Sequence, residues 1–152
     1  MKNLITNTLV SKAGLEALIL RLPIGLILAA HGSQKLFAWF GGYGLDGTGQ
    51  WMASVGLQPG FLMALLAGGA EFFGGVALML GVMTRLAAMV TAMTMLVALF
   101  WVHWGKGFFL TTHGIEYALA LLSATTALIF IGGGKCSLDA LIGSKVREIE
   151  DE

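Results

Sequence analysis

Four apolar stretches, each long enough to cross a membrane as a helix, constrain the fold of this chain more than any other feature of its sequence. They cover approximately residues 15–40, 61–81, 86–104 and 114–131. A hydrocarbon core of about 30 Å needs about 20 helical residues, and strands would need a polar alternation that these continuous runs lack. Since 57% of the residues are hydrophobic and 12% charged, we predict one all-α integral membrane domain, an antiparallel four-helix bundle.

The basic residues predict the orientation of this bundle. Of the nine, all but Lys35 and Lys106 lie on the side that both chain ends share. Cytoplasmic loops of membrane proteins carry the excess of Lys and Arg. We therefore predict an N-in, C-in topology with residues 132–152 as a cytoplasmic tail, surrounded by membrane lipid.

Two shorter helices are expected outside the spans. The first outer loop is predicted to hold an interfacial helix at approximately residues 48–55, with Thr48 as its N-cap and with Trp51 and Met52 in lipid. A second short surface helix is predicted at residues 137–142.

Net charge and cysteine content exclude several classes of function. The nine basic and nine acidic residues cancel, so nucleic acid is not an expected partner. Cys136 is the single cysteine, which excludes an internal disulfide and a dithiol redox pair. No helix carries histidines and carboxylates at metal-ligand spacing, so no metal site is expected. The residues carry no intrinsic flavin or haem signature and name no cofactor.

Polar side chains inside the apolar stretches are the candidate functional residues. An unpaired charge in hydrocarbon costs several kcal/mol, so each such group is expected to face the bundle interior beside a partner. The binding candidates are Arg21, His31, Gln34, Lys35, Glu71, His103 and Glu116. Glu71 and His31 are also the candidates for handling protons, because Glu71 lies near the middle of its stretch and histidine titrates near neutral pH.

Helical spacing assigns these residues to faces. In the first stretch, one stripe holds Arg21, Gly25, Leu28, Gly32 and Lys35, and in the second Gly68, Glu71, Gly74 and Gly75 lie together. In the fourth stretch, the aligned residues are His113, Glu116, Ala120, Ser123 and Ala127. Small residues on these faces would let the helices approach closely.

Depth along each helix predicts the partners. At about 1.5 Å per residue, Lys35 and Glu116 lie at similar depth, and His31 lies about one turn deeper, toward Glu71. We therefore predict that Lys35 pairs with Glu116 and that His31 lies near Glu71, which either fixes the helix register or shapes a pocket. Arg21 lies toward the cytoplasmic half, from where its side chain would reach Glu71 or the interface.

Three segments of the chain resemble the DoxX family of small bacterial inner-membrane proteins. They are RLPIGLILAAHGSQKLF, AEFFGGVALMLGVMTR and GIEYALALLSATTALIFIGGGKCSLDAL, within a resemblance that spans approximately residues 21–141. Where the family has a Gly-Pro-Gly and an aromatic residue before Ser-Leu-Asp, residues 132–136 are GGGKC. The resemblance implies a four-helix bundle of the bacterial inner membrane that is associated with redox metabolism.

Three classes of function stay open. The first is a redox-associated membrane subunit that binds a quinone or a small sulfur compound in a polar pocket of the bundle, together with a partner redox enzyme that carries the electrons. The second is a transporter of small solutes or protons, which would need a homo-oligomer because four helices are few for a monomeric transporter. The third is a scaffold that anchors soluble redox enzymes. Co-purifying quinone, flux in proteoliposomes, or loss of partners on tail deletion would distinguish them.

Overall fold

The computed structural model describes residues 11 and 13–151, and within them every regular element is a helix. The long helices are α2 (Leu15–Phe37), α4 (Gly60–Leu80), α5 (Thr84–Val97), which continues into the π-helical η2 (Ala98–His103), and α6 (Glu116–Ile131). The connections hold η1 (Trp39–Gly41), α3 (Gly44–Ser54) and η3 (Leu110–Thr112), and α7 (Leu138–Asp151) ends the described chain. The all-α prediction is confirmed.

Within the described residues, three segments are long and apolar enough to cross a membrane. They are α2, α4 and the continuous stretch Thr84–His103 that joins α5 to η2. The fourth, α6, is apolar but has 16 residues and so extends about 24 Å. The chain is therefore a multi-pass membrane protein, and a full fourth crossing stays a prediction.

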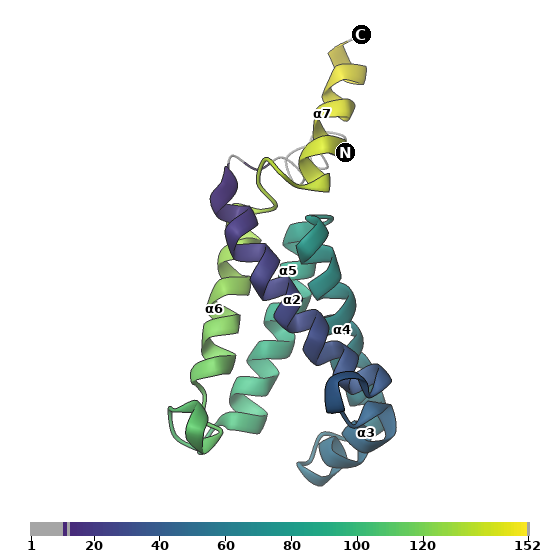
Figure 1. The fold of residues 1–152 in the computed structure, drawn as a ribbon, viewed down its shortest axis with the longest axis vertical. Coiled ribbons are helices and arrows are strands. Elements are labelled where there is room, and N and C mark those ends of the chain that lie inside the picture. The colour runs from purple at the N-terminus through teal and green to yellow at the C-terminus, as the bar shows by residue number, and fades with distance from the viewer. Residues whose placement is uncertain (1–10, 12, 152) are drawn as a thin grey trace.

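The long helices alternate in direction and diverge toward one end. α2 contacts α4 and α6, and α5 contacts the same two helices. The core between them contains Leu28, Leu78, Ala88, Leu121 and Leu128, all nearly inaccessible. Figure 1 shows the helices close together at the end that carries α7, whereas α2 and α4 separate from α5 and α6 toward the end that carries α3.

Glycines bring α2 and α4 into backbone contact. A Cβ atom on Gly25 would lie 2.6 Å from the carbonyl oxygen of Gly75, and one on Gly75 would lie 2.5 Å from the backbone nitrogen of Ala29. Farther along, a Cβ atom on Gly32 would lie 2.7 Å from the Gly68 carbonyl oxygen. The predicted close approach of these two faces is therefore present, because only hydrogen atoms fit where the helices cross.

Backbone conformation and capping move several predicted helix ends. The first helix stops at Phe37, three residues before the predicted end, because Ala38 and Phe40 have left-handed backbones with φ of 59° and 52°. The third begins at Thr84 rather than residue 86. There the Asp139 carboxylate accepts hydrogen bonds from the backbone N–H groups of Met83, at 2.7 Å, and Thr84, at 2.8 Å.

The short helices also differ from the predictions. α3 begins at Gly44, so Thr48 lies inside the helix and not at its N-cap. Met52 faces the protein and is only 5% exposed, because α3 packs against α4, whereas Trp51 is 43% exposed. The C-terminal helix is longer than the six residues predicted, and the Ser137 hydroxyl caps it by accepting a hydrogen bond from the Ala140 N–H at 3.1 Å.

Candidate functional site

A cavity of about 570 Å³ lies between the diverging helices. Its wall is contributed by α2, α3, α4, α5, η2 and α6 and is largely aliphatic, with residues such as Leu28, Met52, Met63, Ala67, Ala70, Met95 and Leu121. The polar side chains on this wall are His31, Lys35, Glu71, Thr94, His103 and Tyr117. An apolar cavity with a few convergent polar groups is typical of a small-molecule site.

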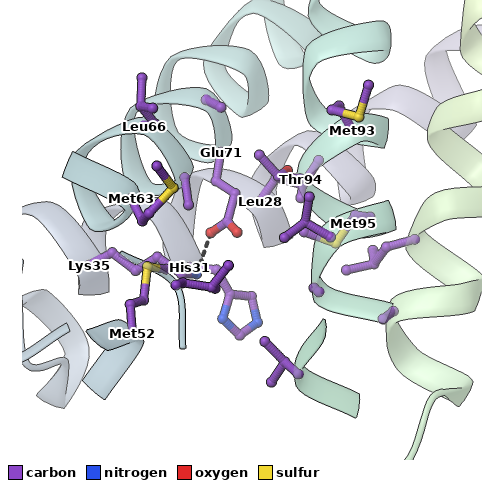
Figure 2. Close-up of a pocket in the computed structure, with 18 of the residues that line it drawn as sticks. Leu28, His31, Lys35, Met52, Met63, Leu66, Glu71, Met93, Thr94 and Met95 are labelled. Atoms are coloured by element: carbon purple, nitrogen blue, oxygen red, sulfur yellow. Dashed lines mark hydrogen bonds and ion pairs between the residues drawn. The ribbon is translucent and has the colours of Figure 1, made fainter. Parts of the chain in front are cut away.

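An ion pair between Lys35 and Glu71 forms the charged part of the cavity wall. The Lys35 ammonium donates a hydrogen bond to the Glu71 carboxylate, which α4 directs into the cavity (Figure 2). The Glu71 side chain is 5% exposed and the Lys35 side chain 23%. The pair keeps both charges away from lipid, as the placement of these residues on inward faces predicted.

The expected pair between Lys35 and Glu116 does not form. Glycine contacts hold α2 against α4, so the end of α2 that carries Lys35 lies beside α4. Figure 1 shows that this end of α2 is remote from the start of α6, where Glu116 is the first residue. Equal depth along the helices was therefore a poor guide, because α2 crosses the other helices at an angle.

The buried face of α6 also differs from the prediction. Ala118, Leu121, Thr125 and Leu128 face the protein, and of the predicted face Ala120, Ser123 and Ala127 are exposed. Glu116 does not line the cavity. The apolar side of α6 packs against α5, which leaves the small and polar side outward.

His31 and Tyr117 form a second polar pair in the wall. The Tyr117 hydroxyl lies 3.4 Å from His31 Nε2, at the long limit of a hydrogen bond, and the rings are 5.9 Å apart between centroids. Figure 2 shows the imidazole beside the Lys35 to Glu71 pair, as expected for His31. The sequence interpretation missed Tyr117, although its position four residues before Leu121 places it on the apolar side of α6.

His103 lines the cavity from η2, with one ring nitrogen engaged. Its Nδ1 lies 2.7 Å from the backbone carbonyl oxygen of His113. Since a carbonyl only accepts hydrogen bonds, Nδ1 carries the hydrogen, and in the neutral ring Nε2 is then an acceptor. Of the residues predicted for the site, His31, Lys35, Glu71 and His103 therefore share one cavity.

Arg21 and Gln34 lie outside this cavity. The Arg21 guanidinium is buried and donates to the carbonyl oxygens of Leu78 (2.9 Å), Gly133 (3.2 Å), Met79 and Cys136. It does not reach Glu71, because the unpaired carbonyls at the end of α4 are nearer and carry negative partial charge. The alternative, that it extends to the membrane interface, stays a prediction. Gln34 lines a neighbouring recess and donates to the Phe40 carbonyl oxygen at 3.3 Å.

The histidine, cysteine and carboxylate side chains in the described part of the chain do not form a metal-binding cluster. Among these residues, no group of three or more histidine, cysteine, aspartate or glutamate side chains is arranged to hold a metal ion. The chemistry that this cavity offers is therefore hydrogen bonding, charge and proton exchange from Lys35, Glu71, His31 and Tyr117.

Comparison with known proteins gives consistent matches. The DoxX family model matches residues 17–104. A Haemophilus influenzae protein, named only as uncharacterized, is 34% identical over 123 residues, which are 79% of this chain and 85% of that protein. "Putative oxidoreductase CatD" of Bacillus subtilis is 34% identical over 111 residues, 73% of this chain and 76% of that protein. No solved structure matches the chain significantly.

Proposed function

Since this chain belongs to the DoxX family, we propose that it is a redox-associated membrane subunit whose cavity binds a quinone. The observation that carries this proposal is the apolar cavity of about 570 Å³ with Lys35, Glu71, His31 and Tyr117 in its wall. The name of the Bacillus subtilis relative, an oxidoreductase, supports a redox role.

The polar groups suit the head of a quinone. A quinone ring has two carbonyl oxygens that accept hydrogen bonds, and its isoprenoid chain is apolar. Lys35 and the Tyr117 hydroxyl are donors for the carbonyl oxygens, while Glu71 accepts a hydrogen bond from a quinol hydroxyl. Ligand cavities generally measure about 300–1,000 Å³, so this one accommodates the ring and the first part of the chain.

In the proposed reaction, this chain handles the protons and a partner protein handles the electrons. Oxidation of a quinol to a quinone releases two electrons and two protons, and reduction takes up the same number. Glu71 and His31 accept or supply the protons. The electrons pass to or from a partner redox protein that carries a flavin, a haem or a metal centre.

We also propose which membrane holds the chain and how the chain crosses it. We place the chain in the bacterial inner membrane as four spans, with α6 as the fourth and both chain ends in the cytoplasm. The loop charges support this orientation, because Lys and Arg predominate on the side of α7. Quinones dissolve in the same membrane and so reach the cavity without entering water.

Quinone titration of the purified protein tests the function. In lipid nanodiscs, a short-chain ubiquinone analogue is expected to quench the fluorescence of Trp51, which lines the cavity. Glu71→Gln should weaken binding about tenfold, the equivalent of about one charge-assisted hydrogen bond. Glu116→Gln makes the same chemical change outside the cavity and should leave the affinity unchanged.

Two results would contradict the proposal. Saturable binding that responds equally to the two glutamine variants would place the quinone elsewhere on the protein. Absence of quinone binding, together with solute or proton flux in proteoliposomes that lack any redox partner, would favour the transport alternative.

A further inference from the structure

A second hollow adjoins the cavity at the end of the protein that carries α3. This recess measures about 530 Å³ and lies among the end of α2, η1 and the first turns of α3. Its wall includes Gln34, Tyr43 and Thr48, and it shares Lys35 and Trp51 with the cavity. These two side chains therefore stand between the recess and the cavity.

The recess has the features of a water-facing space. Tyr43 in its wall is 83% exposed. Tyrosine and tryptophan concentrate where a membrane meets water, and this end of the bundle carries the aromatic residues of η1 and α3. Polar groups and backbone of the α2 to α3 turn form much of the remaining wall.

Away from the recess, the cavity is bordered by exposed apolar side chains of α4 and α5. Leu66 of α4 and Met93 of α5 line it, yet they are 56% and 61% exposed. Val90 and Val97, also of α5, line it and are 41% and 42% exposed. Side chains that both line a cavity and reach the surface mark its opening, and Figure 2 shows Leu66 and Met93 on facing helices. The four side chains that mark this opening are all apolar.

We infer that the site has two entrances that meet at Lys35 and Trp51: an opening between α4 and α5 through which a lipid-dissolved ligand enters, and the recess beside α3 through which water and protons reach the ion pair. The assignment of the lipid-facing entrance to a quinone rests on the proposed function. The two entrances themselves do not depend on it.

The exposed fractions of Lys35 and Glu71 support the assignment of the recess as the entrance for water and protons. Lys35 lines both spaces and its side chain is 23% exposed, whereas Glu71 lines only the cavity and is 5% exposed. A proton that moves between Glu71 and water by this route therefore passes Lys35. Trp51 covers the rest of the boundary with an apolar ring, so that water in the recess stays out of the aliphatic cavity.

Spin-label accessibility in nanodiscs tests the entrances without any ligand. In a Cys136→Ser background, labels are placed by Gln34→Cys in the recess, Met93→Cys at the opening and Phe73→Cys on the outer surface of α4 as the lipid reference. A water-soluble nickel chelate should relax the first label, while oxygen, which concentrates in lipid, should relax the other two. A Gln34 label shielded from nickel, or a Met93 label relaxed by it, would overturn the inference.

The ligand is tested separately from the entrances. Addition of a short-chain ubiquinone analogue should immobilise the Met93 label and leave the Phe73 label unchanged. If the accessibility pattern holds but the quinone affects both labels alike, the proposed function fails and the two entrances stand. If the quinone acts at Met93 although nickel also reaches that label, the entrances fail and the binding function stands.

A third measurement tests the boundary between the two spaces. In the Cys136→Ser background, Thr94→Cys places a thiol in the cavity, and Trp51→Ala should raise its reaction rate with a membrane-impermeant methanethiosulfonate several-fold. Trp104→Ala removes the same ring from a position that lines neither space and should not change the rate. Equal rates in all three backgrounds would show that Trp51 does not separate water from the cavity.

Discussion

At the scale of residues, the ion pair of Lys35 and Glu71 contributes both to stability and to the proposed quinone binding. Substitutions can separate these two contributions. Lys35→Met leaves a carboxylate that is 5% exposed without its partner. Removing one member of a buried pair costs about 3–5 kcal/mol in the free energy of unfolding, because the remaining charge is uncompensated. We expect a loss of this size in reversible unfolding in mixed micelles.

The double variant Lys35→Met with Glu71→Gln provides the control. It removes both charges, so most of the lost stability should return, while quinone affinity stays low because the groups that contact the ring are gone. A double variant that is less stable than Lys35→Met would mean that the two side chains do not act as a pair.

Residue type and helical spacing predicted the inward polar groups of α2 and α4, but neither the buried face of α6 nor which groups meet. Arg21, Lys35 and Glu71 were identified because charge inside an apolar stretch requires a partner. Their partners depend on where the helices cross, and Arg21 is satisfied by four backbone carbonyls, for which side chains give no signal. Tyr117 was missed because a tyrosine in an apolar run is usually a packing residue.

At the scale of elements, the contact between α2 and α4 positions the ion pair. Gly75→Ala places a methyl group 2.5 Å from the Ala29 backbone nitrogen and the Gly25 carbonyl oxygen, so the helices must separate. We expect the variant to lose about 1–3 kcal/mol of stability, as overpacked sites do. Quinone affinity should fall as well, since Lys35 moves away from Glu71.

Gly69→Ala is the matched control on the same helix. No atom lies within 4 Å of the added methyl group. Alanine favours a helix over glycine by about 1 kcal/mol in water, so this variant should be at least as stable as the parent protein. Equal destabilisation by both substitutions would show that the α2 to α4 contact is not backbone-tight.

Helix positions were predictable from the apolar runs, and the connections less so. The start of α2 and both ends of α4, to within one residue, follow from long continuous runs. The end of α2 depends on the left-handed Ala38, and the start of α5 on Asp139, which lies 55 residues later in the chain. The π-helical η2 brings His103 into the cavity wall, and no periodic pattern in the sequence predicts this π-helix. Met52 was placed in lipid because sequence alone does not show that α3 packs on α4.

At the scale of the whole molecule, the divergence of the helix pairs creates the site. Small residues hold α2 to α4. At the end of the bundle that carries α7, residues 133–139 bind Arg21 of α2, Gly81 directly after α4, and the start of α5. The helices are thus held together at one end and diverge toward the other (Figure 1). The cavity lies between the diverging helices. The sequence predicted a pocket in the bundle but not this opening, which depends on crossing angles.

Orientation in the membrane decides which compartment the recess meets. If positive charge keeps the α7 end in the cytoplasm, the recess opens on the opposite side, and protons exchanged at Glu71 leave or arrive there. Cys136 is the chain's single cysteine and is exposed at the α7 end. A membrane-impermeant maleimide should therefore label the parent protein in inverted vesicles but not in intact spheroplasts.

The converse labelling uses the opposite end of the bundle. In a Cys136→Ser background, Tyr43→Cys replaces a side chain that is 83% exposed in the wall of the recess, and it should react in spheroplasts but not in inverted vesicles. Labelling of both positions from the same side would mean that the chain does not place its ends across the bilayer. If Cys136 instead reacted only in spheroplasts and Tyr43→Cys only in inverted vesicles, the recess would face the cytoplasm. Protons at Glu71 would then exchange with the cytoplasmic side.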